Sequence, residues 1–415
     1  MARFTKTVLV FAPVLSLFGW WDQDAQPPSQ ASAEARPVTE IESGPLSDWL
    51  PFLPSWPFFF PKLDRLPDAA PPEDPAAQES PTEPTPTPEP TDQPEPAPDR
   101  PADSVLANWV EWLDDSASGG LAKPAGFQGF YGDQATGAQV WGEQNSGDPL
   151  ATAVLNEIAA YPVAKWVAEG MGTELRGFVD AAAAESKVPV VVAYHIPNRD
   201  CGQHSAGGAA DASEYREWVR TELAPAFQDH AAMLILEPDS LIHLPCLSED
   251  QRQERLALLS DAVDVLAELA PNTAVYLDGG DGAHNSPAEM APRLAAAGVD
   301  RARGFAVNVS NYNTDEKTEE FAAETRKLLT DQHGAEAGYV VDTSRNGAGP
   351  GSDWCNPPNR RLGSPPQLSA TGGQGPDAHL WIKHPGTSDG DCGSGQGTVS
   401  GEFSPEIARE LLDLN

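Results

Sequence analysis

The stretch VPVVVAYHIPNRDCG, residues 188–202, changes abruptly from apolar residues to polar ones. A second stretch, MLILEPDS at residues 233–240, makes the same change after its first four positions. Short apolar runs that are bounded by polar and turn-forming residues predict buried β-strands. The two stretches therefore predict two strands with chemically active residues where each strand ends.

Further apolar runs follow the same pattern, and most of them alternate with segments of helical spacing. These runs lie at 126–131, 274–277, 304–309, 339–341 and 379–382. The clearest helix is predicted at 248–269, where Ser248 and Gln251 form a capping-box pattern. Strands that alternate with helices predict an α/β fold with a parallel sheet and right-handed crossovers. The sheet is either closed into a (β/α) barrel or open and doubly wound, and ligands bind at the C-terminal strand ends in both cases.

Polar side chains stand at or just after the end of most predicted strands. They are Tyr194, Asp200, Asp239, Asp278, Asn308, Asp342, Lys383 and Asp389. Because the C-terminal ends of parallel strands meet on one face, we expect these side chains to share a cleft. Glycoside hydrolysis needs such a set: one carboxyl stays protonated and donates to the leaving oxygen, and another places and activates water.

Other chemistries fit this cleft less well. The acidic residues could hold Ca²⁺, which is kept as a minor alternative. The histidines are scattered and show no H-x-x-x-H spacing, so we expect no metal and no cofactor. No G-x-S-x-G elbow follows a strand, which argues against a serine hydrolase.

Asp342 and Arg345 are interpreted as an internal ion pair that braces a loop.

The chain is strongly acidic, with 62 Asp and Glu against 26 Lys and Arg and a formal charge of −36. An anion of this size has no electrostatic attraction to nucleic acid or to anionic lipid. A neutral polymer remains an acceptable partner. The four cysteines, in an exported chain, predict two disulfides with three possible pairings.

The N-terminal quarter differs in composition from the rest. Arg3 and Lys6 precede an apolar run at 8–21, which is typical of an export signal. The predicted segments are a signal peptide or uncleaved signal anchor at 1–33, a Pro- and aromatic-rich segment of unassigned role at 34–65, an acidic Pro/Thr/Glu-rich linker at 66–101, and a catalytic domain at 102–415. We therefore expect an extracellular protein, either released or tethered to the cell envelope.

Six motifs together resemble the family-6 glycoside hydrolases, which include endoglucanases and cellobiohydrolases. The motifs are Y-x-I-P-N-R-D-C-G at 194–202, E-P-D-S at 237–240, N-V-S-N-Y at 308–312, D-T-S-R-N-G at 342–347, W-C-N-P-P at 354–358 and W-I-K-x-P-G at 381–386. The resemblance covers about residues 125–400 in order. It implies a distorted seven-stranded (β/α) barrel, similar to a TIM barrel, and inversion at the anomeric carbon.

The resemblance also assigns roles to individual residues. Asp239 corresponds to the general acid, and Asp200 to the carboxylate that keeps it protonated and organises water. Asp389 matches the aspartate proposed as the base, and Tyr194 the tyrosine beneath the distorted sugar. The residues expected to bind substrate are Trp354, Lys383, Asp278, Asn308 and His284. In the family, the cysteines pair as Cys201–Cys246 and Cys355–Cys392.

The sequence departs from the family pattern, in which D-A-G-H-S-A-W follows the fourth strand, and three of the departures change the chemistry of the side chain. Asp281 stands in place of a histidine, and His284 stands in place of an aromatic residue. Thr387 replaces an acidic residue. These positions line sugar subsites, so the departures bear on affinity and substrate preference.

The sequence as a whole predicts a secreted, monomeric endo-1,4-β-glucanase that acts on cellulose or a related β-1,4-glucan. A short segment at 357–377 favours an open cleft and internal cutting. Three alternatives stay open. They are an exo-acting cellobiohydrolase, a non-catalytic glycan-binding relative and a hydrolase of a different glucan.

Overall fold

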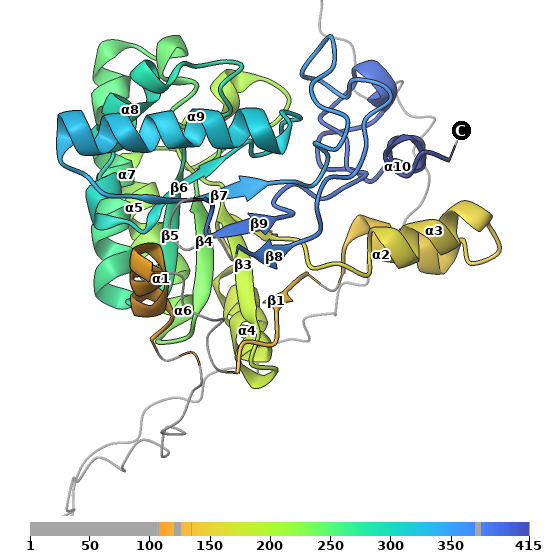
Figure 1. The fold of residues 1–415 in the computed structure, drawn as a ribbon, viewed down its shortest axis with the longest axis horizontal. Helices are drawn as coiled ribbons and strands as arrows, with labels where there is room; N and C mark the ends of the chain where they lie inside the picture. The colour runs from red at the N-terminus through yellow and green to blue at the C-terminus, as the bar shows by residue number, and fades with distance from the viewer. Residues whose placement is uncertain (1–105, 107, 120–125, 134, 370–374, 415) are drawn as a thin grey trace, which may run out of the picture. The chain divides into compact units, whose positions relative to one another are not determined.

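The computed structural model describes residues 106, 108–119, 126–133, 135–369 and 375–414, and a mainly parallel β-sheet lies at its centre (Figure 1). The strands are β1 (Phe130–Tyr131), β2 (Lys165–Val167), β3 (Val188–Ala193), β4 (Ala232–Leu236), β5 (Thr273–Asp278), β6 (Gly304–Val307), β7 (Gly338–Asp342), β8 (Gln367–Leu368) and β9 (Ala378–Leu380). Their order is β1-β3-β4-β5-β6-β7-β9-β8, and β2 also pairs with β3. Each of these pairings is parallel except that of β8 with β9.

Helices follow most of the strands and cover the outer face of the sheet (Figure 1). They are α1 (Trp109–Gly119), α2 (Gly137–Gln144), α3 (Pro149–Glu157), α4 (Gly172–Ala184), α5 (Ala212–Trp218), α6 (Ala224–Phe227), α7 (Glu249–Leu269), α8 (Pro287–Ala296), α9 (Asp315–Leu328) and α10 (Pro405–Leu411). Short 3₁₀ or π turns occupy Asp200–Gly202, Val219–Leu223, Leu244–Cys246, Val299–Arg301, Leu329–His333 and Gly393–Gly395. The predicted capping box is present at the start of α7, where the Ser248 side chain and Gln251 each satisfy the other's backbone N–H.

Most strands contribute to two separate cores because their side chains alternate between the faces of the sheet. In β4, Met233 and Ile235 join an inner cluster to which α1 contributes Trp109. Leu234 and Leu236 of the same strand pack instead in the outer cluster, under the helices. A smaller third core joins α2, α3 and α10, which lie together beyond one end of the sheet (Figure 1).

The sheet curls into a nearly closed barrel. The Ala164 N–H donates to the Trp381 carbonyl at 3.0 Å, and the Trp166 indole N–H donates to the Ile382 carbonyl at 2.9 Å. These two bonds join the β2 region to the chain that follows β9. The α/β barrel expected from the sequence is therefore confirmed, and every predicted strand is present.

Two short strands, β2 and β8, were not predicted. β2 has three residues and β8 has two, so neither shows a periodicity that could be read from the sequence. The predicted segments at 1–33, 34–65 and 66–101 lie outside the described residues and stay predictions. Among the described helices, none combines the length and the apolar character that crossing a membrane requires.

Candidate active site

A cavity of about 690 Å³ opens at the C-terminal ends of the strands. The predicted site residues in its wall are Tyr194, Asp200, Asp239, His284, Trp354, Lys383 and Asp389. Asp278 and Asn308 do not reach the wall and lie buried beneath it. The Asn308 amide donates to the Asp342 carbonyl at 2.9 Å, so it joins two strand ends.

Asp239 has an unusual backbone conformation, and hydrogen bonds hold both its backbone and its side chain. Its φ of 67° lies in the left-handed region, which a non-glycine residue adopts only where the surroundings impose it. The carboxylate of Asp278 accepts the Asp239 N–H at 2.7 Å. The side chain of Asp239 also accepts a hydrogen bond from the Tyr194 hydroxyl at 3.3 Å.

The electrostatics around Asp239 favour its protonated form. Burial raises the pKa of Asp239, and the nearby Asp200 carboxylate raises it further, while His243 lowers it. Burial also raises the pKa of Asp278, with the charge of Asp239 as a second cause. Carboxyl groups that share a buried site cannot all ionise cheaply. The arrangement therefore suits a proton donor.

Asp200 has the opposite electrostatic character. Burial alone would raise its pKa, but the hydrogen bonds from His243 and the Ser205 N–H outweigh burial and lower it. The Ser205 N–H lies 2.7 Å from one carboxylate oxygen, and His243 Nε2 lies 3.5 Å from the other. One ligand atom from each of Asp200, Asp239 and His243 lies within 4.8 Å of the others. A carboxyl group whose pKa is lowered thus stands beside one whose pKa is raised.

Asp389 is buried in an ion-paired network. One oxygen lies 2.8 Å from Arg345 Nη2 and 3.2 Å from Lys383 Nζ. The other oxygen accepts from the Tyr312 hydroxyl at 3.2 Å and from the Asn356 N–H at 3.1 Å. Burial would raise the pKa of Asp389, but the two cations outweigh it and lower the pKa to about 2. Asp389 is therefore ionised at any working pH.

The expected ion pair between Asp342 and Arg345 is wrong. Asp342 accepts hydrogen bonds from the backbone N–H groups of Ser310, Ser344 and Lys383. Arg345 pairs with Asp389 instead. The backbone groups already satisfy Asp342, so the guanidinium is free to reach the cleft.

Some residues of the site were not predicted from the sequence. Trp166 on β2 lines the cavity and meets the Tyr194 ring edge-on at 5.2 Å. His243 follows the E-P-D-S motif by three residues, and only the fold shows its contact with Asp200. Glu237 is fully buried and accepts two backbone N–H bonds from the chain after β3, which fixes the two strand ends together.

The two disulfides pair as the resemblance implied. Cys201–Cys246 joins the loops after β3 and β4, and Cys355–Cys392 joins the loops after β7 and β9. Trp354 precedes the second disulfide, and its side chain is 45% exposed at the cavity wall. An exposed indole on a tethered loop provides a flat surface for a sugar ring.

Comparison with known proteins agrees with this geometry. Residues 128–411 match the family described as "Glycosyl hydrolases family 6". The chain belongs to glycosyl hydrolase family 6. Endoglucanase 1 of Streptomyces halstedii is 42% identical over 288 residues, which cover 68% of this chain and 88% of that protein. Endoglucanase 1 of a Streptomyces species, strain KSM-9, is 41% identical over 66% of this chain and 76% of its own length.

A solved family-6 structure gives the same result. The endoglucanase of Mycobacterium tuberculosis, determined with a thio-linked methyl cellobiosyl cellobioside, superposes with a TM-score of 0.64. It is 38% identical in sequence, and the match covers 70% of this chain and 98% of that one.

An acid–histidine pair lies at the cleft, at two of the positions where the sequence departs from the motif expected from the resemblance. The buried Asp281 lies 2.9 Å from Nδ1 of His284, and it also accepts the backbone N–H groups of Ala283 and His284. The hydrogen bond to Asp281 raises the pKa of His284, although burial opposes it. When protonated, the imidazole presents Nε2–H to the cleft as a hydrogen-bond donor, whereas the neutral ring that donates from Nδ1 to Asp281 presents Nε2 as an acceptor.

Proposed function

We propose that this protein is an inverting endo-1,4-β-glucanase that cleaves cellulose or a related β-1,4-glucan. The observation that carries the proposal is the pair Asp239 and Asp200 at the cavity. One carboxyl is kept protonated by burial, and its neighbour is kept ionised by hydrogen bonds. The relatives named as endoglucanases support internal cutting.

Asp239 donates its proton to the oxygen of the glycosidic bond as that bond breaks. Its surroundings favour the neutral acid before the reaction, since the ionised Asp200 repels a second negative charge. Tyr194 donates a hydrogen bond to Asp239 and lies where the sugar at the cleavage point would rest. Asp200 orients the water that attacks from the opposite face of the sugar.

Asp389 acts on that water rather than on the leaving group. A carboxylate with a pKa of about 2 is a weak proton acceptor, although it is a strong hydrogen-bond acceptor. Its role is therefore to hold a water molecule and to stabilise positive charge in the transition state. Asp200, which pairs with one histidine instead of two fixed cations, is therefore a better candidate for the base than Asp389, to which the resemblance assigned that role.

Substrate binding depends on aromatic and cationic groups around the carboxylates. Trp354 and Trp166 offer rings to the sugars, and Lys383 donates to hydroxyl groups. Asp278 and Asn308 support the site from beneath, by positioning the backbone of Asp239 and the neighbouring strand ends.

The enzyme acts outside the cell as a monomer. Two disulfides suit an oxidising compartment. Residues 1–33 direct export, as a cleaved signal peptide or as an anchor in the envelope. Residues 66–101 form an acidic spacer between this segment and the catalytic domain.

The stereochemistry of the product tests the mechanism. Early in hydrolysis of a cello-oligosaccharide, proton NMR should show the α-anomer accumulating before mutarotation. The β-anomer as first product would mean retention and would contradict the assigned roles.

A different β-glucan is the second candidate substrate, because His284 stands where the family has an aromatic residue. Comparison of rates on cellulose and on mixed-linkage glucan separates the two. The second substrate would be favoured by two results together. The wild type should act faster on mixed-linkage glucan than on cellulose, and His284→Trp should lose rate on mixed-linkage glucan selectively.

A further inference from the structure

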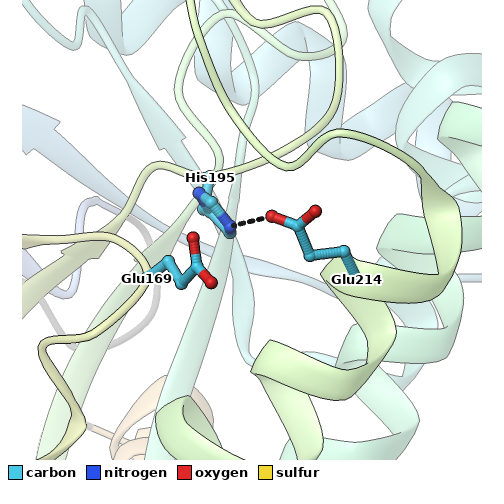
Figure 2. A group of neighbouring side chains, drawn as sticks. All are labelled: Glu169, His195 and Glu214. Carbon is cyan, nitrogen blue, oxygen red and sulfur yellow. Dashed lines mark ion pairs between the residues drawn. The ribbon is translucent and has the colours of Figure 1, made fainter.

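His195 and two glutamates form a compact cluster at the end of β3 (Figure 2). One ligand atom from each of Glu169, His195 and Glu214 lies within 4.8 Å of the other two. Glu169 lies in the loop after β2, and Glu214 lies in the first turn of α5. Three separate segments of the fold thus converge on one point.

The cluster is separate from the catalytic cleft, although His195 follows Tyr194 directly. Tyr194 lines the cavity, whereas the His195 ring packs edge-on against Trp218 of α5, with 4.9 Å between ring centroids. Neighbouring residues of an extended chain point in opposite directions. His195 therefore faces the helices rather than the substrate.

The imidazole of His195 is buried and has an unsatisfied nitrogen. His195 is 5% exposed, and its Nε2 has no hydrogen bond to any residue that the structure describes. Figure 2 shows this nitrogen directed toward Glu214, whose Oε1 is 3.8 Å away, beyond hydrogen-bond length. A buried polar atom without a partner is costly, so a ligand at this point would stabilise the fold.

Carboxylates outnumber cations around this nitrogen, although Arg199 adds an opposing positive charge. Neither Glu169 nor Glu214 forms an ion pair with a lysine or arginine in the described part of the chain. Glu222 adds a third carboxylate nearby, since it accepts the Gly170 N–H at 2.8 Å, next to Glu169. A cation would offset the repulsion between these groups.

We propose that Glu169, His195 and Glu214 bind a divalent transition-metal ion of the Zn²⁺ type. One imidazole nitrogen and two carboxylate oxygens are donors that Zn²⁺ accepts, whereas Ca²⁺ and Mg²⁺ prefer oxygen alone. Bond lengths near 2.0 Å require ligand atoms about 3.3 Å apart, which rotations of both glutamate side chains, the exposed Glu169 and the half-buried Glu214, can provide. Three protein ligands leave one position for water.

The metal would clamp the loop after β2 and the start of α5 to the residue next to Tyr194. Its role is structural, because it lies on the outer side of β3. The proposal departs from the expectation of a metal-free chain. Sequence spacing did not predict it because the three ligands come from three distant segments.

Zn²⁺ titration of the untagged, EDTA-treated full chain tests the site. Isothermal titration should show one tight site in the wild type, and a hundredfold excess of Zn²⁺ over its Kd should raise Tm by about 5 °C. Glu169→Gln and Glu214→Gln should each weaken binding by at least about tenfold. Ca²⁺ at the same concentration should leave Tm unchanged.

Glu217→Gln is the matched control, because Glu217 is exposed on α5 and lies outside the cluster. It should bind Zn²⁺ like the wild type. Glu169 is itself exposed, so the Glu169→Gln protein should fold normally and keep its Tm in EDTA. Undiminished Zn²⁺ binding in both cluster variants would place the ion at Asp200, Asp239 and His243 instead and would overturn the proposal. A wild-type chain that fails to bind Zn²⁺ would overturn it as well.

Discussion

Asp239 is positioned, and its pKa is tuned, by three neighbours that act in different ways. Asp278 fixes its backbone, Asp200 disfavours its ionisation, and Tyr194 donates to its side chain. None of these contacts involves the substrate, so the acid is prepared before the glucan binds. Such preorganisation is what allows a positioned group to transfer its proton efficiently.

The first prediction concerns Asp239 itself. Asp239→Asn keeps the shape of the side chain but removes the proton that is donated. The rate on cellotetraose should fall by about 10²- to 10⁴-fold, which is the usual contribution of a general acid. Steady-state kinetics and calorimetric binding of cellotetraose measure turnover and affinity separately.

The exposed Asp250 on α7 provides the control, because Asp250→Asn makes the same chemical change at a residue that does not line the cavity. Its rate should match the wild type. A nearly normal rate for Asp239→Asn would remove this residue from its assigned role.

We expect His243 to shift the alkaline limit of activity through its effect on the pKa of Asp239. While it carries its proton, it lowers the pKa of Asp239, which is otherwise raised by burial and by Asp200. His243→Gln removes this positive charge, so the pKa of Asp239 should rise further. The alkaline limb of the kcat/KM profile should then move to higher pH, and a movement to lower pH would contradict this coupling.

The Asp281–His284 pair should make stability depend on pH. The pKa of His284 is raised in the fold above its ordinary value of 6.5, mainly by its hydrogen bond to Asp281. Its contribution is therefore complete below pH 6.5 and is lost as the pH rises through the raised pKa. The side chain is 47% exposed, so water screens the pair and the effect stays below about 1 kcal/mol.

Urea unfolding of the wild type and His284→Gln at pH 6 and pH 9 measures this contribution. The wild type should exceed the variant in unfolding free energy by more at pH 6 than at pH 9. At pH 6, Asp281 stays ionised because its own pKa is lowered. An equal difference at both pH values would show that the pair adds no charge-dependent stability.

The loops of the site depend on two covalent links between strand ends. Cys201 and Cys246 are separated by 45 residues, and Cys355 and Cys392 by 37. The chain-entropy account gives about 4 kcal/mol for closing loops of this size. Cys201 directly follows Asp200 and Cys355 directly follows Trp354, so the links restrain both residues.

Replacing Cys201 and Cys246 with alanine should therefore lower the unfolding free energy by up to about 4 kcal/mol. Urea denaturation measures the loss, and the Cys355→Ala/Cys392→Ala protein should lose a similar amount. Unchanged stability in both proteins would mean that the unfolded chain gains little freedom when these links are removed.

At the scale of elements, the sequence predicted what depends on local pattern. The apolar run of β3 and the capping box of α7 carry their own signals. β2 was missed because its three residues form a strand only by pairing with β3 and by the bonds to the chain after β9. Tertiary contacts, not propensity, make it a strand.

At the scale of the whole molecule, the barrel brings together residues that lie far apart in the chain. Strand-end positions were enough to predict that Asp200, Asp239 and Asp389 would share a cavity. The partner of Arg345 and the cluster around His195 could not be predicted, because each depends on which way a side chain turns after its strand ends. The direction of a side chain follows from its packing in the fold, which cannot be read from the sequence alone.

Simultaneous measurement of viscosity and reducing ends tests the central claim most directly, with the full chain acting on carboxymethylcellulose. An endo-1,4-β-glucanase cuts within the polymer, so the viscosity should fall rapidly while few new reducing ends appear. Reducing ends that accumulate while the viscosity stays high would mean exo-action. If neither the viscosity nor the number of reducing ends changes, on this substrate or on amorphous cellulose, the result would contradict the proposed activity itself.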